Sequence, residues 1–541
     1  MSRNANSRFA VNPTNLDISR SRFPRHSDIK LTFNVGDVVP FYVDEVLPGD
    51  THQIDTSKVI RLQTPATPFM DNVYLDCYYF FVPNRLVWEH WKEFQGENTK
   101  SAWIPEVTYS VPQLVSPAGG FAKGTLADYM GIPTKVAGLS VNALPFRAYA
   151  LIMNEWFRDQ NLTDPLNIPI DDATRTGVNT GSSPSDVALG GLPFKAAKYH
   201  DYFTSCLPAP QKGPDVGIGL TGSFPVTTPL QSTGTGHVGM GWNDSSGSPL
   251  STGKADVSVW GGDTKAGNTG GLYPNNLTVD LGSVNSVTVN ELRMAFQLQK
   301  LYEKDARNGS RYIEILKGHF GVTSPDARLQ RPEYLGGNRI PFNVNQVVST
   351  ALAGSAENVE NLGTTGAYSL TVDHHSDFTR SFVEHGFVIG VCVARYDHSY
   401  QNGIERFWSR KTRFDYYFPV LANIGEQAIL NKEIYADGSA KDSEVFGYQE
   451  AWADYRYKPS RVCGEMRSNA QTSLDVWHLA DNYNSCPALS DSWIREDKNN
   501  VDRVLTVASS VSDQIFADFY VQNFTTRPMP LYSIPGLIDH H

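Results

Sequence analysis

Residues 72–82, NVYLDCYYFFV, and residues 386–396, GFVIGVCVARY, decide the fold class of this chain. Both runs are rich in β-branched and aromatic residues, which favour strands. Pro83 stops the first run because proline cannot donate a hydrogen bond to a neighbouring strand. About 300 residues separate the two runs, so strands must pair across a large gap, as in a Greek-key or jelly-roll sandwich with long loops.

Other stretches extend this pattern. Strand-like composition recurs at residues 29–35, 38–47, 58–63, 412–420 and 515–524. Residues 144–161 and 290–307 instead place apolar side chains at the i, i+3, i+4, i+7 spacing of a helix, and Asn308-Gly309 supplies a stop signal. We therefore predict a mostly β sandwich with helices inserted beside a sheet, and assign these helices no chemistry.

Length and composition narrow the class of protein. At 541 residues the chain exceeds the usual domain of about 100–200 residues. Charged residues make up 19%, below a typical value of about 25%, while aromatic residues reach 11%. This composition excludes a disordered chain, a coiled coil and a collagen-like fibre. The net charge of −11 argues against a protein that coats nucleic acid with its whole surface, so any such contact must be local or helped by a basic partner.

Cysteines and the N-terminal sequence indicate the compartment. The five cysteines form no CxxC pair or zinc spacing, so we expect buried free thiols in a reducing compartment: Cys77, Cys206, Cys392, Cys463 and Cys486. The first residues contain no apolar run of a signal peptide, and the longest apolar stretch, 387–394, is far shorter than the roughly 20 residues of a membrane span. We expect synthesis in a cytoplasm and no membrane insertion.

Two segments differ in composition from the rest. Residues 1–27 form a basic, extended arm that carries Arg3, Arg8, Arg20, Arg22 and Arg25, which are candidates to face nucleic acid. Residues 213–272 contain 15 glycines in 60 positions, with short β runs at 255–260 and 277–281. We interpret this second segment as an ordered, loop-rich excursion.

Enzyme and cofactor signatures are weak. Two GxGxxG matches, at 217–222 and 234–239, lack the strand and helix of a dinucleotide site, and P-loop, HExxH and GxSxG motifs are missing from the sequence. Adjacent His374 and His375 point to opposite faces of a strand, so only one could share a metal with His385. Asp373 and Asp377 lie nearby, but we expect surface or capping roles there, and a turn cap at Asp397-His398. No catalytic residue, metal or cofactor is predicted.

The clearest chemistry is basic and aromatic. Residues 405–419 read ERFWSRKTRFDYYFP, and residues 451–467 repeat the mixture. Guanidinium groups neutralise phosphates, and aromatic rings stack unpaired bases at about 1–3 kcal/mol per base. This makes four cations candidates to face nucleic acid: Arg406, Arg410, Lys411 and Arg413. A core strand or a protein–protein interface, where Arg, Tyr and Trp are enriched, explains the same composition.

Several long segments together resemble a known family. Residues 72–98 (NVYLDCYYFFVPNRLVWEHWKEFQGEN) and 394–429 (ARYDHSYQNGIERFWSRKTRFDYYFPVLANIGEQAI) are similar to the major capsid proteins of gokushoviruses, small single-stranded DNA phages of the Microviridae. Residues 20–50, 144–162 and 453–468 share the similarity. It extends from about residue 20 to the end, apart from the glycine-rich excursion, and its motifs are long.

The resemblance implies an all-β, eight-stranded viral jelly roll with long loop and helix insertions. Residues 28–212 and 284–541 would form a discontinuous shell domain, with the arm 1–27 facing inward. Identical copies, one per asymmetric unit, would build the smallest icosahedral shell around circular single-stranded DNA. The shell would assemble in the host bacterial cytoplasm, with a small basic DNA-binding protein and internal scaffolding or pilot proteins as partners.

In the same family an insertion forms a protrusion at the threefold axes, thought to engage a host-surface receptor. By position this matches residues 213–283, and Trp242, Trp260 and Tyr273 are the candidate receptor-facing side chains. The second hypothesis is a lectin-like or carbohydrate-active β-sandwich in which these aromatic residues stack sugars. An enzyme would need a convergent carboxylate pair or a metal site, and the sequence indicates neither.

Overall fold

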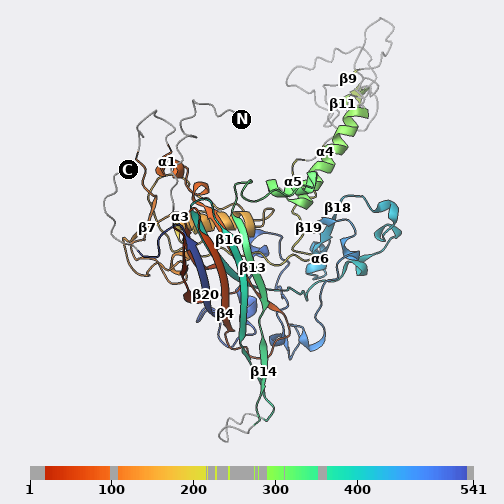
Figure 1. Ribbon diagram of the computed structural model, residues 1–541. Helices are drawn as coiled ribbons and strands as arrows, with labels where there is room; N and C mark the ends of the chain where they lie inside the picture. The colour runs from red at the N-terminus through yellow and green to blue at the C-terminus, as the bar shows by residue number, and fades with distance from the viewer. Residues whose placement is uncertain are drawn as a thin grey trace, which may run out of the picture. The chain divides into compact units, whose positions relative to one another are not determined.

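The order of the strands defines two antiparallel sheets. One sheet, called the covered sheet here, has β5 (Val73–Pro83) between β13 (Glu333–Pro341) and β17 (Gly386–Tyr396), with β3 (Val39–Val46) on the far side of β17. In the other, called the open sheet, β20 (Ile515–Arg527) pairs with β4 (Thr51–Leu62), which pairs with β16 (Thr371–Ser381). Figure 1 shows β20 beside β4, and β1 (Ser21–Pro24) and β2 (Ser27–Phe33) pair with successive parts of β20.

The computed structural model describes residues 19–97, 108–214, 216, 226–227, 242–243, 273–274, 278–279, 289–309, 311–350 and 362–532. Two compact units divide the chain: Met1–Pro210 with Asp305–His541, and Gln211–Lys304. Both sheets belong to the first unit. Among the described residues, no helix has the length and apolar character to span a bilayer.

The two sheets share one buried core. Phe41 of β3 stacks on Phe519 of β20 with ring centroids 4.5 Å apart, and the Tyr79 hydroxyl of β5 lies 2.8 Å from that of Thr56 in β4. Apolar side chains from both sheets form a single cluster around these contacts. Because two antiparallel sheets enclose one core, the prediction of an all-β sandwich is confirmed.

Helical turns cover the outer face of the covered sheet. Phe146 and Tyr149 of α3 (Leu144–Ile152) belong to one buried cluster with Phe80 of β5 and Val391 of β17. With both faces covered, β17 needs apolar residues at nearly every position, which explains its continuous apolar run. The predicted helix over 144–161 continues after α3 as a π-helical turn and ends at Phe157.

β4 alternates between buried and partly exposed residues. Only residues 58–63 were predicted as a strand here, yet the strand begins at Thr51. Three of the inward positions carry the polar side chains His52, Thr56 and Lys58, which conceal the period of two in the sequence. β13 was not predicted because it contains Gly336 and Gly337, and glycine is uncommon in strands. Both positions require glycine, since a Cβ would lie only 2.3 Å (Gly336) or 2.1 Å (Gly337) from a neighbouring carbonyl oxygen.

The prediction of a strand at residues 412–420 is wrong. The chain forms two 3₁₀ turns there, Arg413–Asp415 and Pro419–Leu421. The Asp415 carboxylate accepts hydrogen bonds from the backbone amides of Lys411 and Thr412 at 2.8 and 2.7 Å, which favours a turn. The aromatic side chains that suggested a buried strand are exposed.

The remaining elements are short, apart from two helices. The predicted helix over 290–307 is confirmed as α4 (Val289–Asn308), and α5 (Tyr312–Phe320) follows. The other helices are α1 (Trp91–Phe94), α2 (Leu126–Tyr129), α6 (Asn431–Ile434), α7 (Asp491–Ile494) and α8 (Lys498–Asp502). The other strands are β6 (Gln113–Val115), β7 (Ser140–Asn142), β8 (Arg175–Thr176), β9 (Val226–Thr227), β10 (Trp242–Asn243), β11 (Tyr273–Pro274), β12 (Thr278–Val279), β14 (Val344–Val348), β15 (Thr365–Ser369), β18 (Glu426–Leu430) and β19 (Val445–Glu450).

A buried charge network follows β17, where the sequence suggested a turn cap. His398 places Nδ1 3.0 Å from Asp481 and Nε2 3.0 Å from Glu496, and all three side chains are buried. Burial alone would lower the pKa of His398, but the charges and hydrogen bonds of Asp481 and Glu496 raise it to about 9. The Lys198 ammonium lies 3.3 Å from Asp481 and adds a second cation. The His398 imidazolium therefore links distant parts of residues 397–514, the long connection between β17 and β20.

We predict that His398→Gln lowers the melting temperature of the dissociated subunit at pH 7, because removing one partner of a buried ion pair costs about 3–5 kcal/mol. The folded-state pKa of about 9 exceeds the unfolded value of about 6.5, so the stabilisation is complete below about pH 6.5 and disappears as the pH rises through 9. Melting temperatures between pH 6 and 10 measure this loss.

The matched control is His374→Gln, whose exposed imidazole contacts only the Ser57 hydroxyl among the hydrogen bonds found for it. It should leave both the stability and its dependence on pH close to those of the wild type. Parallel pH profiles for wild type and His398→Gln would contradict the charged state of His398.

Candidate binding surface

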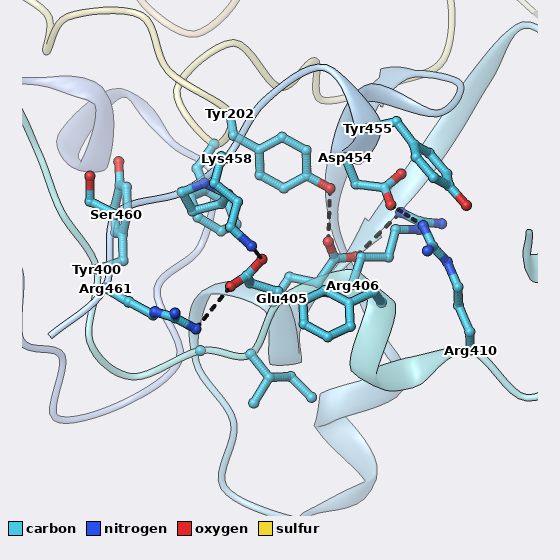
Figure 2. Close-up of a pocket in the computed structure, with 16 residues that line it drawn as sticks. Tyr202, Tyr400, Glu405, Arg406, Arg410, Asp454, Tyr455, Lys458, Ser460 and Arg461 are labelled. Atoms are coloured by element: carbon cyan, nitrogen blue, oxygen red, sulfur yellow. Dashed lines mark hydrogen bonds and ion pairs between the residues drawn. The ribbon is translucent and has the colours of Figure 1, made fainter. Parts of the chain in front are cut away.

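The two basic and aromatic segments meet in one pocket. A cavity of about 430 Å³ is lined by side chains from residues 400–410 and 454–461, together with Tyr202, Phe203 and Glu433 (Figure 2). Strand pairing between β18 and β19 joins the two segments, because β18 follows the first of them and β19 precedes the second. The sequence predicted the segments but not their convergence, which depends on this long-range pairing.

Acidic residues balance the cations of the pocket. Arg410 pairs with Asp454, and Glu405 pairs with Lys458 and also lies 3.7 Å from Arg461 (Figure 2). A surface that neutralises phosphates needs uncompensated cations. These ion pairs therefore argue against the pocket as a phosphate site.

Glu433 is a buried carboxyl in the lining of the pocket. Its Oε2 accepts a hydrogen bond of 2.8 Å from the Tyr202 hydroxyl, and its Oε1 lies 3.3 Å from Arg406. Burial raises the pKa of Glu433 although Arg406 and these hydrogen bonds act in the opposite direction. Phe203 and Tyr400, which also line the pocket, have ring centroids 4.8 Å apart. These residues are not signalled by any motif, because 231 positions separate Tyr202 from Glu433.

Cations of these segments also lie over aromatic rings of their own chain. Arg410 lies 4.4 Å from the Tyr455 ring centroid, and Arg413 lies 5.5 and 5.9 Å from those of Phe414 and Phe418. Neither Lys411 nor Arg413 has a described carboxylate within ion-pair distance. Of the four predicted nucleic-acid candidates in this segment, two are therefore paired and two are open to a partner.

The described part of the N-terminal arm includes a strand, β1, that is hydrogen-bonded to a sheet, whereas the sequence predicted only an extended segment. β1 pairs with the end of β20, where Arg22 donates to Gln53 at 3.1 Å and lies 4.3 Å from the Phe524 ring centroid. Arg25 forms a bidentate pair with Asp44 at 2.6 and 2.7 Å. Arg20 donates to the Gly49 carbonyl. Arg3 and Arg8 lie outside the described residues.

Two of the predicted receptor-facing residues lie on paired strands. β10 and β11 pair so that Asn243 faces Tyr273 and Trp242 faces Pro274. A second pair, β9 with β12, lies in the same unit. The predicted β run at 277–281 includes β12, whereas the run at 255–260 and Trp260 lie outside the described residues.

The histidine and cysteine predictions have mixed outcomes. His374 and His375 do lie on a strand, with Nδ1 atoms 2.9 Å from Ser57 and 3.1 Å from Asp377. Within the described ranges, no three His, Cys, Asp or Glu side chains gather as metal ligands.

All five cysteines are free, but Cys463 is exposed and Cys486 is half-buried, so the expectation that all were buried is wrong for these two.

Comparison with known proteins identifies the family. The sequence model described as "Capsid protein (F protein)" matches residues 12–537 of this chain. The chain belongs to this family of phage capsid proteins. Capsid protein VP1 of Spiroplasma virus 4 is 42% identical over 526 residues, covering 95% of this chain and 94% of the relative.

Two further capsid proteins match over almost the whole length. Capsid protein VP1 of Bdellovibrio phage phiMH2K is 43% identical over 536 residues, covering 98% of this chain and 97% of that protein. Capsid protein VP1 of Chlamydia phage 1 is 41% identical over 590 residues, with the same coverage. This capsid protein is therefore a structural component of a phage virion, made to assemble with identical subunits, and not an enzyme. The lectin-like alternative has no support.

Proposed function

We propose that this capsid protein builds a small, closed icosahedral shell, one chain per asymmetric unit, around a circular single-stranded DNA genome. The observation that carries the proposal is the strand order, β2–β20–β4–β16 in one sheet and β3–β17–β5–β13 in the other. This order supports an eight-stranded jelly roll, the two-sheet architecture common in viral capsids. The relatives named capsid protein VP1 support the same architecture.

The sandwich suits a shell because its long connections are available to contact neighbouring subunits. Residues 84–332 join β5 to β13, and residues 397–514 join β17 to β20. A rigid scaffold with long loops can meet several neighbours at once, so contacts that are weak individually act together when the shell closes.

Purified capsid protein should assemble into uniform small spherical shells, because closure of the shell links many contacts of one type. Negative-stain microscopy, with light scattering as the chain is concentrated, measures this outcome. A chain that stays strictly monomeric at high concentration would exclude the proposal.

The arm 1–27 is proposed to face the DNA. Its support is local charge, since residues 1–30 contain six Lys and Arg against two Asp in a chain with a net charge of −11. Arg20 and Arg22 are exposed, whereas Arg25 is committed to Asp44. A small basic protein of the phage would supply the remaining positive charge, in the host cytoplasm where assembly is proposed.

Arg20→Ala with Arg22→Ala should lower the DNA content or the yield of particles, because fewer phosphates are neutralised. The ratio of absorbance at 260 and 280 nm in purified particles reports the content. Arg25→Ala is the matched control: it should lower the melting temperature by breaking the Asp44 pair, with a smaller effect on DNA. An unchanged DNA content and particle yield in the double variant would show that the arm does not bind the DNA through these residues.

Residues 213–283 are proposed to form the threefold protrusion that contacts a host receptor. The separate compact unit Gln211–Lys304 supports this, and so does the β10–β11 pairing that brings the Trp242 and Tyr273 positions onto adjacent strands. Trp260 is included on the basis of sequence alone.

Deletion of residues 220–275 should leave shell assembly intact and abolish infection, because the sheets and their core lie outside this unit. Particle counts by microscopy and plaque titres on the host measure the two effects separately. Loss of particles would show that the segment is needed for assembly, and full infectivity would show that it is not needed for attachment to the host.

A further inference from the structure

An unusually apolar surface covers residues 404–424. Trp408 and Phe414 are each 69% exposed and Val420 is 93% exposed. Six more large apolar side chains in these 21 residues are exposed: Ile404, Phe407, Tyr416, Tyr417, Phe418 and Ile424. We call this set the 404–424 surface. Scattered exposed apolar residues are normal, but nine in so short a stretch are not.

Ring contacts make this surface continuous with its surroundings. Phe407 and Trp408 have ring centroids 4.7 Å apart, and the Lys458 ammonium lies 5.3 Å from the Phe407 centroid. The Arg410 guanidinium lies 5.4 Å from the Tyr416 ring centroid and 4.4 Å from that of Tyr455. Because Phe407 and Tyr455 also line the cavity, the pocket of Figure 2 opens onto the 404–424 surface.

The backbone beneath the 404–424 surface is held in place. The Trp452 indole donates to the Leu421 carbonyl at 2.8 Å, and the Tyr417 amide donates to the Tyr455 hydroxyl at 3.3 Å. Asp415 caps the 3₁₀ turn Arg413–Asp415. A surface already fixed in this way loses less conformational entropy when a partner binds it.

The exposed area matches what a stable contact between proteins requires. An aromatic side chain buries about 150–250 Å² when covered, so the exposed parts of the six aromatic side chains alone come to about 500–800 Å², and Ile404, Val420 and Ile424 add to this area. A standard interface takes about 800 Å² from each partner, whereas the largest apolar patch of a typical monomer is about 300–600 Å². The 404–424 surface is therefore large enough to form one half of an interface.

Composition and charge decide between a protein partner and nucleic acid. Protein interfaces are enriched in Tyr, Trp, Phe and Arg, which dominate residues 404–424. Arg406 and Arg410 already have carboxylate partners, which leaves few free cations for phosphates. Lys411 and Arg413 have no described carboxylate within ion-pair distance, so in a chain with a net charge of −11 the acidic remainder of another copy complements these two cations.

We propose that the 404–424 surface is a contact between copies of this chain, in which side chains of the neighbouring subunit enter the pocket beside Phe407 and Tyr455. The proposal rests on the family's assembly from identical subunits. It replaces the nucleic-acid interpretation of Lys411 and Arg413 with a role at this contact.

The test compares assembly of the full-length wild type with Trp408→Ala/Phe414→Ala. Both side chains are mostly exposed, so the variant should keep the melting temperature of the wild-type subunit. Loss of two central aromatic anchors should raise the concentration needed for assembly about tenfold or more. The matched control, Trp408→Phe/Phe414→Leu, keeps apolar contacts at both positions and should assemble close to the wild-type concentration.

Three results would overturn the proposal: assembly of the Ala variant at the wild-type concentration, equal loss of assembly in the conservative control, or normal shells with less DNA. The last result would favour nucleic acid as the partner. If the wild type itself forms no shells, the proposed shell fails, and sedimentation velocity still decides this contact. Weaker self-association of the Ala variant would then support the contact, and unchanged self-association would exclude it.

Discussion

The pairing of β17 with β5 is the constraint on which the other parts of this capsid protein depend. Eleven residue pairs run from Gly386 opposite Pro83 to Tyr396 opposite Val73. One face of the pair supplies the core shared with the open sheet, and the other holds α3. Because the strands are antiparallel, the 84–332 and 397–514 connections leave from opposite ends of this pair. Phe203 and Tyr400 bring the two connections into contact again.

Buried charges fix how those connections lie against the sandwich. Asp76 of β5 is fully buried between Arg339 of β13 and Arg395 of β17, each with a nitrogen 2.6 Å from a carboxylate oxygen. Burial alone would raise the pKa of Asp76, but the two arginines lower it overall. The Tyr199 hydroxyl, from the 84–332 connection, donates to the same carboxylate at 2.8 Å. Such pairs contribute little net stability, but a shifted register would leave a buried charge without a partner.

The sequence could predict the elements whose side chains follow one physical rule. β5 and β17 are covered on both faces and read as continuous apolar runs, and α4 has a clear helical period. β4 could be predicted only in part because its inward face mixes apolar side chains with Thr56 and Lys58. Their partners, Tyr79 and Asn338, are far away in the sequence. In the same way, the basic segments of the pocket were visible, whereas the carboxylates that balance them were not.

Residues 412–420 show why composition alone is ambiguous. Aromatic and apolar residues are favoured both in a buried strand and in a surface that another protein will cover, and propensity does not distinguish the two. The distinguishing signals are Asp415, which caps a turn, and Pro419, which cannot donate to a sheet. A segment that satisfies its backbone in local turns and still exposes its aromatic rings has no cover among the described residues of its own chain. For a subunit of a shell, low overall charge and exposed aromatic residues therefore have one cause, since the assembled particle, and not the single chain, completes the burial.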